Sequence, residues 1–236
     1  MKRITIVLLS LAGNALHFSR KTSINYTMMK QSLLLFIVLA FQSVSGQKVI
    51  TINQKGNDLK SFYLSLNVEN GWLAGQHVNW ETGMADHPDA TSGNHTHCSA
   101  FVAAACKRMN IYILRPPEHK QVLLANAQYE WLPTPEALNA GWKPVAAGNS
   151  YEAAQRMANN GVVVVAICRN PDEKKPGHAA LVMPAELSIN ELNENGPAVI
   201  MAGTHNHAII SLRKGFKSHL TGWPEHSVSF YYNQGR

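Results

Sequence analysis

The residue best placed for chemistry in this chain is a cysteine at the predicted start of an apolar, Ala-rich helix. A polar stretch, residues 93–97, leads into Cys98, and no Gly or Pro interrupts the chain from there to Met109. The first turn of a helix has unpaired N–H groups and a partial positive charge, which both favour thiolate over thiol. Cys98 is therefore predicted to be an activated thiol. The alternative is that it is one more small core residue.

A second stretch places a histidine at the first position of an apolar strand. A turn rich in Lys, Pro and Gly precedes His178, and residues 179–183 are apolar. Upstream, residues 161–168 are typical of a buried strand. A hairpin loop is expected to join this strand to the one that begins at His178. An imidazole beside a helix-start thiol can take the thiol proton and return it to a leaving group. Taken together with Cys98, His178 predicts a thiolate–imidazolium pair, whereas alone it would be an ordinary loop histidine.

These two stretches resemble the NlpC-like branch of the papain-fold cysteine hydrolases. Cell-wall members of that branch have a cysteine-led helix start and a later Gly-His pair that opens a strand, which match residues 97–102 and 177–178 here. By order of elements the resemblance extends from about residue 79 to the C-terminus, with His97 where an acidic residue is usual and Ala100 where Gly is usual. It implies a papain-like α+β fold in which a central helix packs on an antiparallel sheet.

The resemblance also implies an activity and a third site residue. The expected reaction is hydrolysis of amide bonds in the peptide part of peptidoglycan through an acyl-enzyme, without a metal or cofactor. In the family, a polar side chain after the histidine strand holds the imidazole in the right tautomer. Because strand side chains alternate, either His205 and His207 or Asn206 would face the site. Asn206 is the preferred residue, since an amide does not compete for the proton, and His205 is the alternative.

The first 46 residues are expected to be a leader. Lys30 is followed by an apolar run, residues 33–41, and by small residues at 43–46, which is the pattern of a secretory signal peptide. Cleavage near Gly46 would give a secreted or periplasmic protein that begins near Gln47.

The leader could begin at Met1 or at the pair Met28 and Met29. Met28 or Met29 could be the true start, although residues 4–16 form a second apolar run behind basic residues. Neither apolar run reaches the roughly 20 residues of a membrane-spanning helix. We therefore expect no stable membrane insertion after cleavage, with an uncleaved anchor as the lesser alternative.

Charge and composition describe one ordinary folded domain after the leader. Five of the 21 Lys and Arg residues, and no acidic residue, lie in residues 1–46, so the net charge falls from +6 to +1 without them. The chain therefore offers no basic patch that would argue for a nucleic-acid partner. Residues 47–236 are predicted to be a single hydrolase domain with a helical insertion at about 111–160.

The three cysteines leave a second question open. If Cys98 is the nucleophile, Cys106 and Cys168 could form a disulfide or could both be reduced core residues. The expected partner is the peptide of peptidoglycan, and the residues do not identify an immunity or inhibitor protein.

Two other functions fit the same residues. The histidines at 95, 97, 178, 205 and 207, with Cys98, could bind zinc and make the protein a metallohydrolase, although no helical His-Glu-x-x-His or Cys-x-x-Cys pair supports this. A non-catalytic cell-wall-binding module is the third hypothesis, in which Trp72 and Trp80 would stack on glycan or peptide.

Overall fold

The computed structural model describes residues 48–87, 95–146, 148–218 and 228–235. The chain divides into two units, residues 1–46 and 47–236, and all of the described residues belong to the second unit. The expected leader, its cleavage site and the alternative starts at Met28 and Met29 lie outside the described residues.

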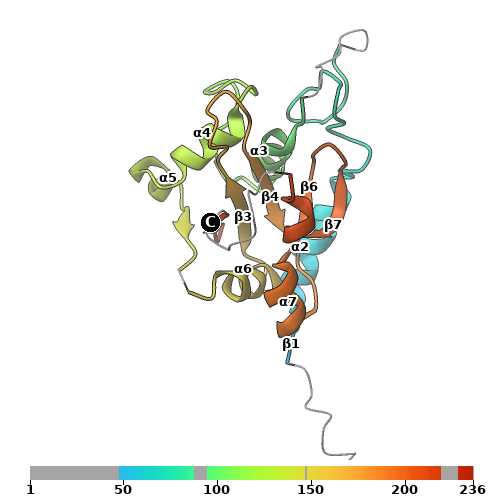
Figure 1. Cartoon of the computed structure of the whole chain (residues 1–236), viewed down its shortest axis with the longest axis vertical. Coiled ribbons are helices and arrows are strands. Elements are labelled where there is room, and N and C mark those ends of the chain that lie inside the picture. Colours follow the sequence, from blue (N-terminus) through green and yellow to red (C-terminus); the bar gives the residue numbers. More distant parts are fainter. Residues whose placement is uncertain (1–47, 88–94, 147, 219–227, 236) are drawn as a thin grey trace, which may run out of the picture. The chain divides into compact units, whose positions relative to one another are not determined.

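A six-stranded antiparallel sheet forms the centre of the described unit (Figure 1). Its strands, in spatial order, are β2 (Lys143–Pro144), β8 (Ser229–Asn233), β3 (Val163–Cys168), β4 (His178–Val182), β6 (Ala198–Met201) and β7 (His207–Ser211). A separate two-stranded sheet pairs β1 (Val49–Ile50) with β5 (Leu187–Ser188), also antiparallel. The mixed α+β class with an antiparallel sheet, predicted from the sequence, is therefore confirmed.

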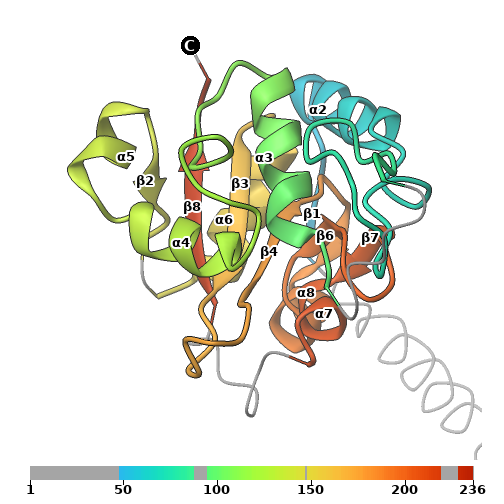
Figure 2. The ribbon, with the colours of Figure 1, turned by 90° about the horizontal axis from the view of Figure 1, so that it is seen from above.

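Helices cover both faces of the six-stranded sheet (Figure 2). The first face carries α3 (Cys98–Arg108) and α4 (Leu124–Trp131), and its core cluster also includes residues of α2 (Gln54–Ser65). The second face packs against α6 (Ser150–Asn159), α7 (Ile189–Asn195) and α8 (Leu212–Gly215). The stretch from 111 to 160, where a helical insertion was predicted, contains α4, α5 (Pro135–Asn139) and α6 as well as the short strand β2.

The central strands are buried on both sides because of this arrangement. Every residue of β3 and β4 is buried, which explains their continuous apolar sequence. Alternation divides β3 between two cores: Val165 and Ile167 pack in the α3 cluster, whereas Ala166 and Cys168 pack in the α6 cluster.

Helix α3 is enclosed on all sides for most of its length. The prediction that it begins at Cys98 is confirmed, and every residue from there to Cys106 is buried. Its alanines are small, so the helix backbone can approach the sheet closely, and Phe101 packs edge-on against Trp72 at a ring-centroid distance of 5.2 Å. Among the described residues, no helix has the length and apolar character needed to cross a membrane.

Two buried amides on α6 join the ends of β4 and β6. Gln155 donates to the Met183 carbonyl at 2.9 Å and accepts from the Ala198 N–H at 2.9 Å. Asn159 donates to the Ala185 carbonyl at 2.9 Å and accepts from the Ala185 N–H at 3.0 Å. These side chains satisfy backbone groups that would otherwise be buried without partners.

We expect Gln155→Met to lower the free energy of unfolding by about 2–4 kcal/mol, because at least two buried backbone groups lose their partners at about 1–3 kcal/mol each. Urea denaturation followed by circular dichroism measures this change. Gln54→Met, at an exposed position of α2, is the matched control and should stay within about 0.5 kcal/mol of the parent. Equal effects of the two substitutions would contradict the role assigned to the Gln155 amide.

Candidate active site

Cys98 is the first residue of α3 and lies against the beginning of β4. Its side chain is buried, at 3% exposure. The backbone amides of Ala179, Ser99 and Cys98 itself favour the thiolate and act to lower the pKa of this thiol. The thiol thus faces the kind of donor set that stabilises an anion, supplied by the helix start and by the neighbouring strand.

Burial outweighs these donors in setting the acidity of the thiol. Desolvation raises the pKa of Cys98 above its ordinary value of 9.0, and the hydrogen bonds from the backbone lower it only in part. The expectation of a depressed pKa is therefore wrong for the arrangement described. The reason is that α3 is enclosed by the core, which a helix-start argument does not take into account.

His178 is the first residue of β4, as predicted, and is 1% exposed. Its partner across the β3–β4 ladder is Cys168, so the two share a face of the sheet, opposite to the face on which Ala179 meets α3. The imidazole packs edge-on against the Phe216 ring, at a centroid distance of 4.6 Å. The ring is therefore in contact with the face that carries α8.

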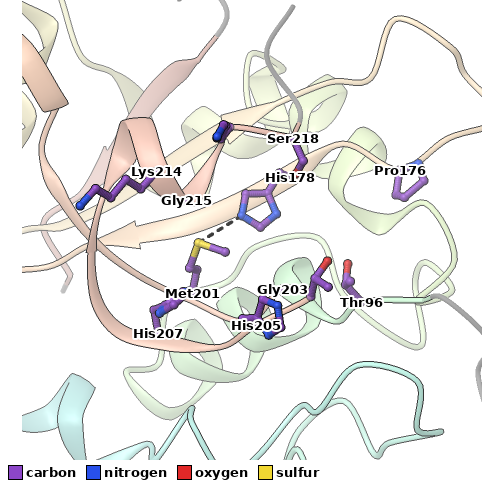
Figure 3. Close-up of a pocket in the computed structure, with 12 residues that line it drawn as sticks. Thr96, Pro176, His178, Met201, Gly203, His205, His207, Lys214, Gly215 and Ser218 are labelled. Atoms are coloured by element: carbon purple, nitrogen blue, oxygen red, sulfur yellow. Dashed lines mark hydrogen bonds between the residues drawn. The ribbon is translucent and has the colours of Figure 1, made fainter.

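Met201, the last residue of β6, is in polar contact with the imidazole (Figure 3). Its Sδ lies 3.4 Å from Nε2 of His178. A thioether sulfur can only accept a hydrogen bond, so this contact assigns the proton of the neutral imidazole to Nε2. Nδ1 is then the nitrogen that can accept a proton from a reacting group.

A cavity of about 560 Å³ opens beside His178 (Figure 3). Its lining includes Thr96, two residues before the nucleophile candidate, together with His205 and the two cations Lys214 and Lys217. Cys98 is not among the described lining residues. The cavity therefore reaches the imidazole directly, and Thr96 of the segment before α3 forms part of its wall.

The structure brings Cys98 and His178 to the same end of β4. The groups that lower the pKa of the thiol by hydrogen bonding are the backbone of Ala179, Ser99 and Cys98 itself and the Ser99 side chain. The thiolate–imidazolium pair stays a prediction. Catalytic hydrogen bonds are often long in the absence of substrate and tighten in the complex, so both residues keep their candidate roles.

Asn206 is hydrogen-bonded to backbone groups rather than to the imidazole. Its Oδ1 accepts from the Gly203 N–H at 2.9 Å, and its Nδ2 donates to the carbonyls of Val68 at 2.8 Å and Gly71 at 2.6 Å. A Cβ placed on Gly203 would lie 3.8 Å from Cε1 of His178. Asn206 therefore holds the turn that passes beside His178, which is a positioning role.

His205, the alternative third residue, is exposed and lines the cavity, as does His207. The residue that does contact Nε2, Met201, was missed because its apolar type does not suggest a polar role. No local signal in the sequence points to it, because a register irregularity between Val199 and Met201 interrupts the alternation along β6.

All three cysteines are free. Cys106 packs in the α3 core and Cys168 on the opposite face of the sheet, so the disulfide left open by the sequence does not form. Burial raises the pKa of each of these two thiols to about 12. Their environment suits inert core residues.

The histidines of the alternative zinc hypothesis do not form a group with metal-ligand spacing among the described residues. His97 is buried, and its Nε2 lies 2.9 Å from the Gln76 carbonyl oxygen. In the part of the chain that the structure describes, the three-residue group with metal-ligand spacing is a different one, His77, Asp86 and His87.

Comparison of the chain with protein-family models, with curated proteins and with solved structures finds no match. The chemistry of the site therefore follows from the residues that form it.

We expect Asn206→Asp to lower the free energy of unfolding by about 2–4 kcal/mol, because a carboxylate cannot donate to the two carbonyl oxygens that the amide holds. Urea denaturation at neutral pH measures the effect. His205→Ala, one residue away and exposed, should change stability by no more than about 0.5 kcal/mol. A tolerated aspartate at 206 would show that the amide is not needed in this turn.

The pH dependence of alkylation of the native protein should reflect the raised pKa of Cys98. We expect the rate of iodoacetamide labelling at Cys98, mapped by mass spectrometry, to rise with pH through a midpoint above 9.0, with Cys106 and Cys168 titrating near 12. In urea all three should titrate together near the free-thiol value of about 8.5. A native Cys98 midpoint well below that value would contradict the burial argument.

Proposed function

We propose that the protein is a secreted cysteine hydrolase that cleaves amide bonds in the peptide part of bacterial peptidoglycan. The observation that carries the proposal is the position of Cys98, at the start of a buried helix and with His178 opening the adjacent strand. We also propose that the fold is papain-like and of the NlpC type. The leader expected in residues 1–46 supports export.

The raised pKa makes general-base activation the first chemical step. As the Cys98 sulfur attacks the amide carbonyl carbon, Nδ1 of His178 takes the thiol proton, and the carbonyl oxygen becomes an oxyanion. The imidazolium then gives that proton to the amine nitrogen, and the carbon–nitrogen bond breaks. The products of this half-reaction are a free amine and a thioester on Cys98.

Water completes the cycle at the same residues. His178, neutral again, takes a proton from water as the water oxygen attacks the thioester carbon, and the sulfur leaves and is reprotonated. The backbone N–H of Cys98, at the start of α3, is the donor we assign to the oxyanion in both half-reactions. The contact of Met201 with Nε2 favours the tautomer that this sequence of steps needs.

The residues that line the cavity favour a substrate peptide that carries carboxylates. Lys214 and Lys217 contribute two ammonium groups to its wall, and His205 and Thr204 add exposed polar side chains. Charge-assisted hydrogen bonds from such cations hold carboxylates well. Peptidoglycan stem peptides carry free carboxylates, so they suit this lining.

We expect Cys98→Ala to abolish release of new amino groups from purified peptidoglycan and His178→Ala to lower the rate by about 10²–10⁴-fold, the usual contribution of a general base. Amine labelling of the products and mass spectrometry measure the cleavage. Cys106→Ala and His119→Ala are the matched controls for a cysteine and a histidine outside the site, and should retain the parent rate.

Full activity in Cys98→Ala would overturn the proposed mechanism. Binding of intact peptidoglycan by the parent and by Cys98→Ala alike, without cleavage by either, would instead make the protein a wall-binding module.

A further inference from the structure

A hairpin before α3 places a histidine and an aspartate opposite each other. Val78 and Ala85 form an antiparallel bridge, and the Asp86 N–H donates to the His77 carbonyl at 3.3 Å. In this register His77 and Asp86 are the next facing pair, so their side chains emerge on the same face of the hairpin. Nδ1 of His77 lies 2.5 Å from Oδ1 of Asp86.

His87 completes the group. Its ring centroid lies 4.9 Å from that of His77, and one ligand atom from each of His77, Asp86 and His87 falls within 4.8 Å of the others. All three residues are exposed, so an ion could reach them from solvent.

We propose that His77, Asp86 and His87 bind a divalent transition-metal ion, with zinc as the ion to test. Two imidazoles and a carboxylate are a donor set that zinc accepts, with one position left for water. Bonds of about 2.0–2.1 Å in a tetrahedron bring ligand atoms to about 3.3 Å from one another. Rotation of the exposed His87 side chain suffices to close the remaining distance.

The turn of the same hairpin is anchored to the buried part of the molecule. Trp72, which is buried, donates its backbone N–H to the Gly83 carbonyl at 2.7 Å and its ring N–H to the Trp80 carbonyl at 2.8 Å. Lys107 of α3 pairs with Glu81 of the hairpin at 2.6 Å. A rigid support of this kind lowers the cost of bringing ligands together.

The proposed ion has a structural role that is separate from the hydrolytic reaction. Cys98 and His178 are not among its ligands, and the hairpin contacts the segment before α3 through the bond between His97 and the Gln76 carbonyl. The ion would therefore fix the open end of the hairpin beside the entrance to the helix.

The test uses the full chain, freed of metal by a chelator and titrated with Zn²⁺ by calorimetry. We expect one equivalent to bind and the melting temperature to rise with Zn²⁺ concentration. His77→Ala, His87→Ala and Asp86→Asn should each weaken binding at least about 10- to 100-fold, since even loss of an outer-shell partner has that effect. Absorption of bound Co²⁺ gives a second readout of the same ligands.

The controls separate this site from the other histidines. His119→Ala and the double substitution His205→Ala with His207→Ala should keep the parent affinity for Zn²⁺. Absence of Zn²⁺ binding by the parent would overturn the proposal. Unchanged affinity in the three hairpin variants, or loss of binding in Cys98→Ser, would also overturn it.

Equal melting temperatures of the metal-free parent and variants show that the variants are folded, and His77→Gln provides a milder replacement. Because none of these measurements depends on peptidoglycan cleavage, failure of the metal site is distinguishable from failure of the proposed hydrolase.

Discussion

The close packing of α3 on β4 is the constraint on which the rest of the structure depends. Small side chains along the helix let it lie against the strand, and helices on both faces then enclose the sheet. The first residue of the helix meets the beginning of the strand as a direct result. The same enclosure that positions the thiol also removes water from it, so position and acidity cannot be adjusted independently.

Strand alternation determines where His178 lies once the contact between β4 and α3 is set. Because Ala179 faces α3, its neighbour His178 must face the other side, where Phe216 and Met201 receive the ring. Cys98 and His178 thus both lie at the beginning of β4.

Much of the fold was predictable from local patterns. The uninterrupted apolar run after Cys98, the valine-rich strand that ends at Cys168 and the strand that begins at His178 all have the predicted type, since periodicity and turn residues act over a few positions. The α+β class was implied by the family resemblance of the two stretches that contain Cys98 and His178.

What the sequence could not supply was information that depends on distant segments. Asn206 was assigned to the imidazole by family resemblance, but its partners Val68 and Gly71 lie far away in the chain. The register irregularity between Val199 and Met201 also defeats counting along β6. The acidity of Cys98 depends on enclosure by the whole core, and the pairing of His77 with Asp86 depends on a hairpin with only one bridge.

The place of β8 in the sheet has a consequence for how the chain is made. This strand, at residues 229–233, lies between β2 and β3, which precede it by many residues. Until it has left the ribosome, the apolar β3 has an unpaired edge and β2 has no neighbour in the sheet. Such an edge is a template for pairing with other chains. A growing chain of this topology thus cannot close its sheet until β8 has been made.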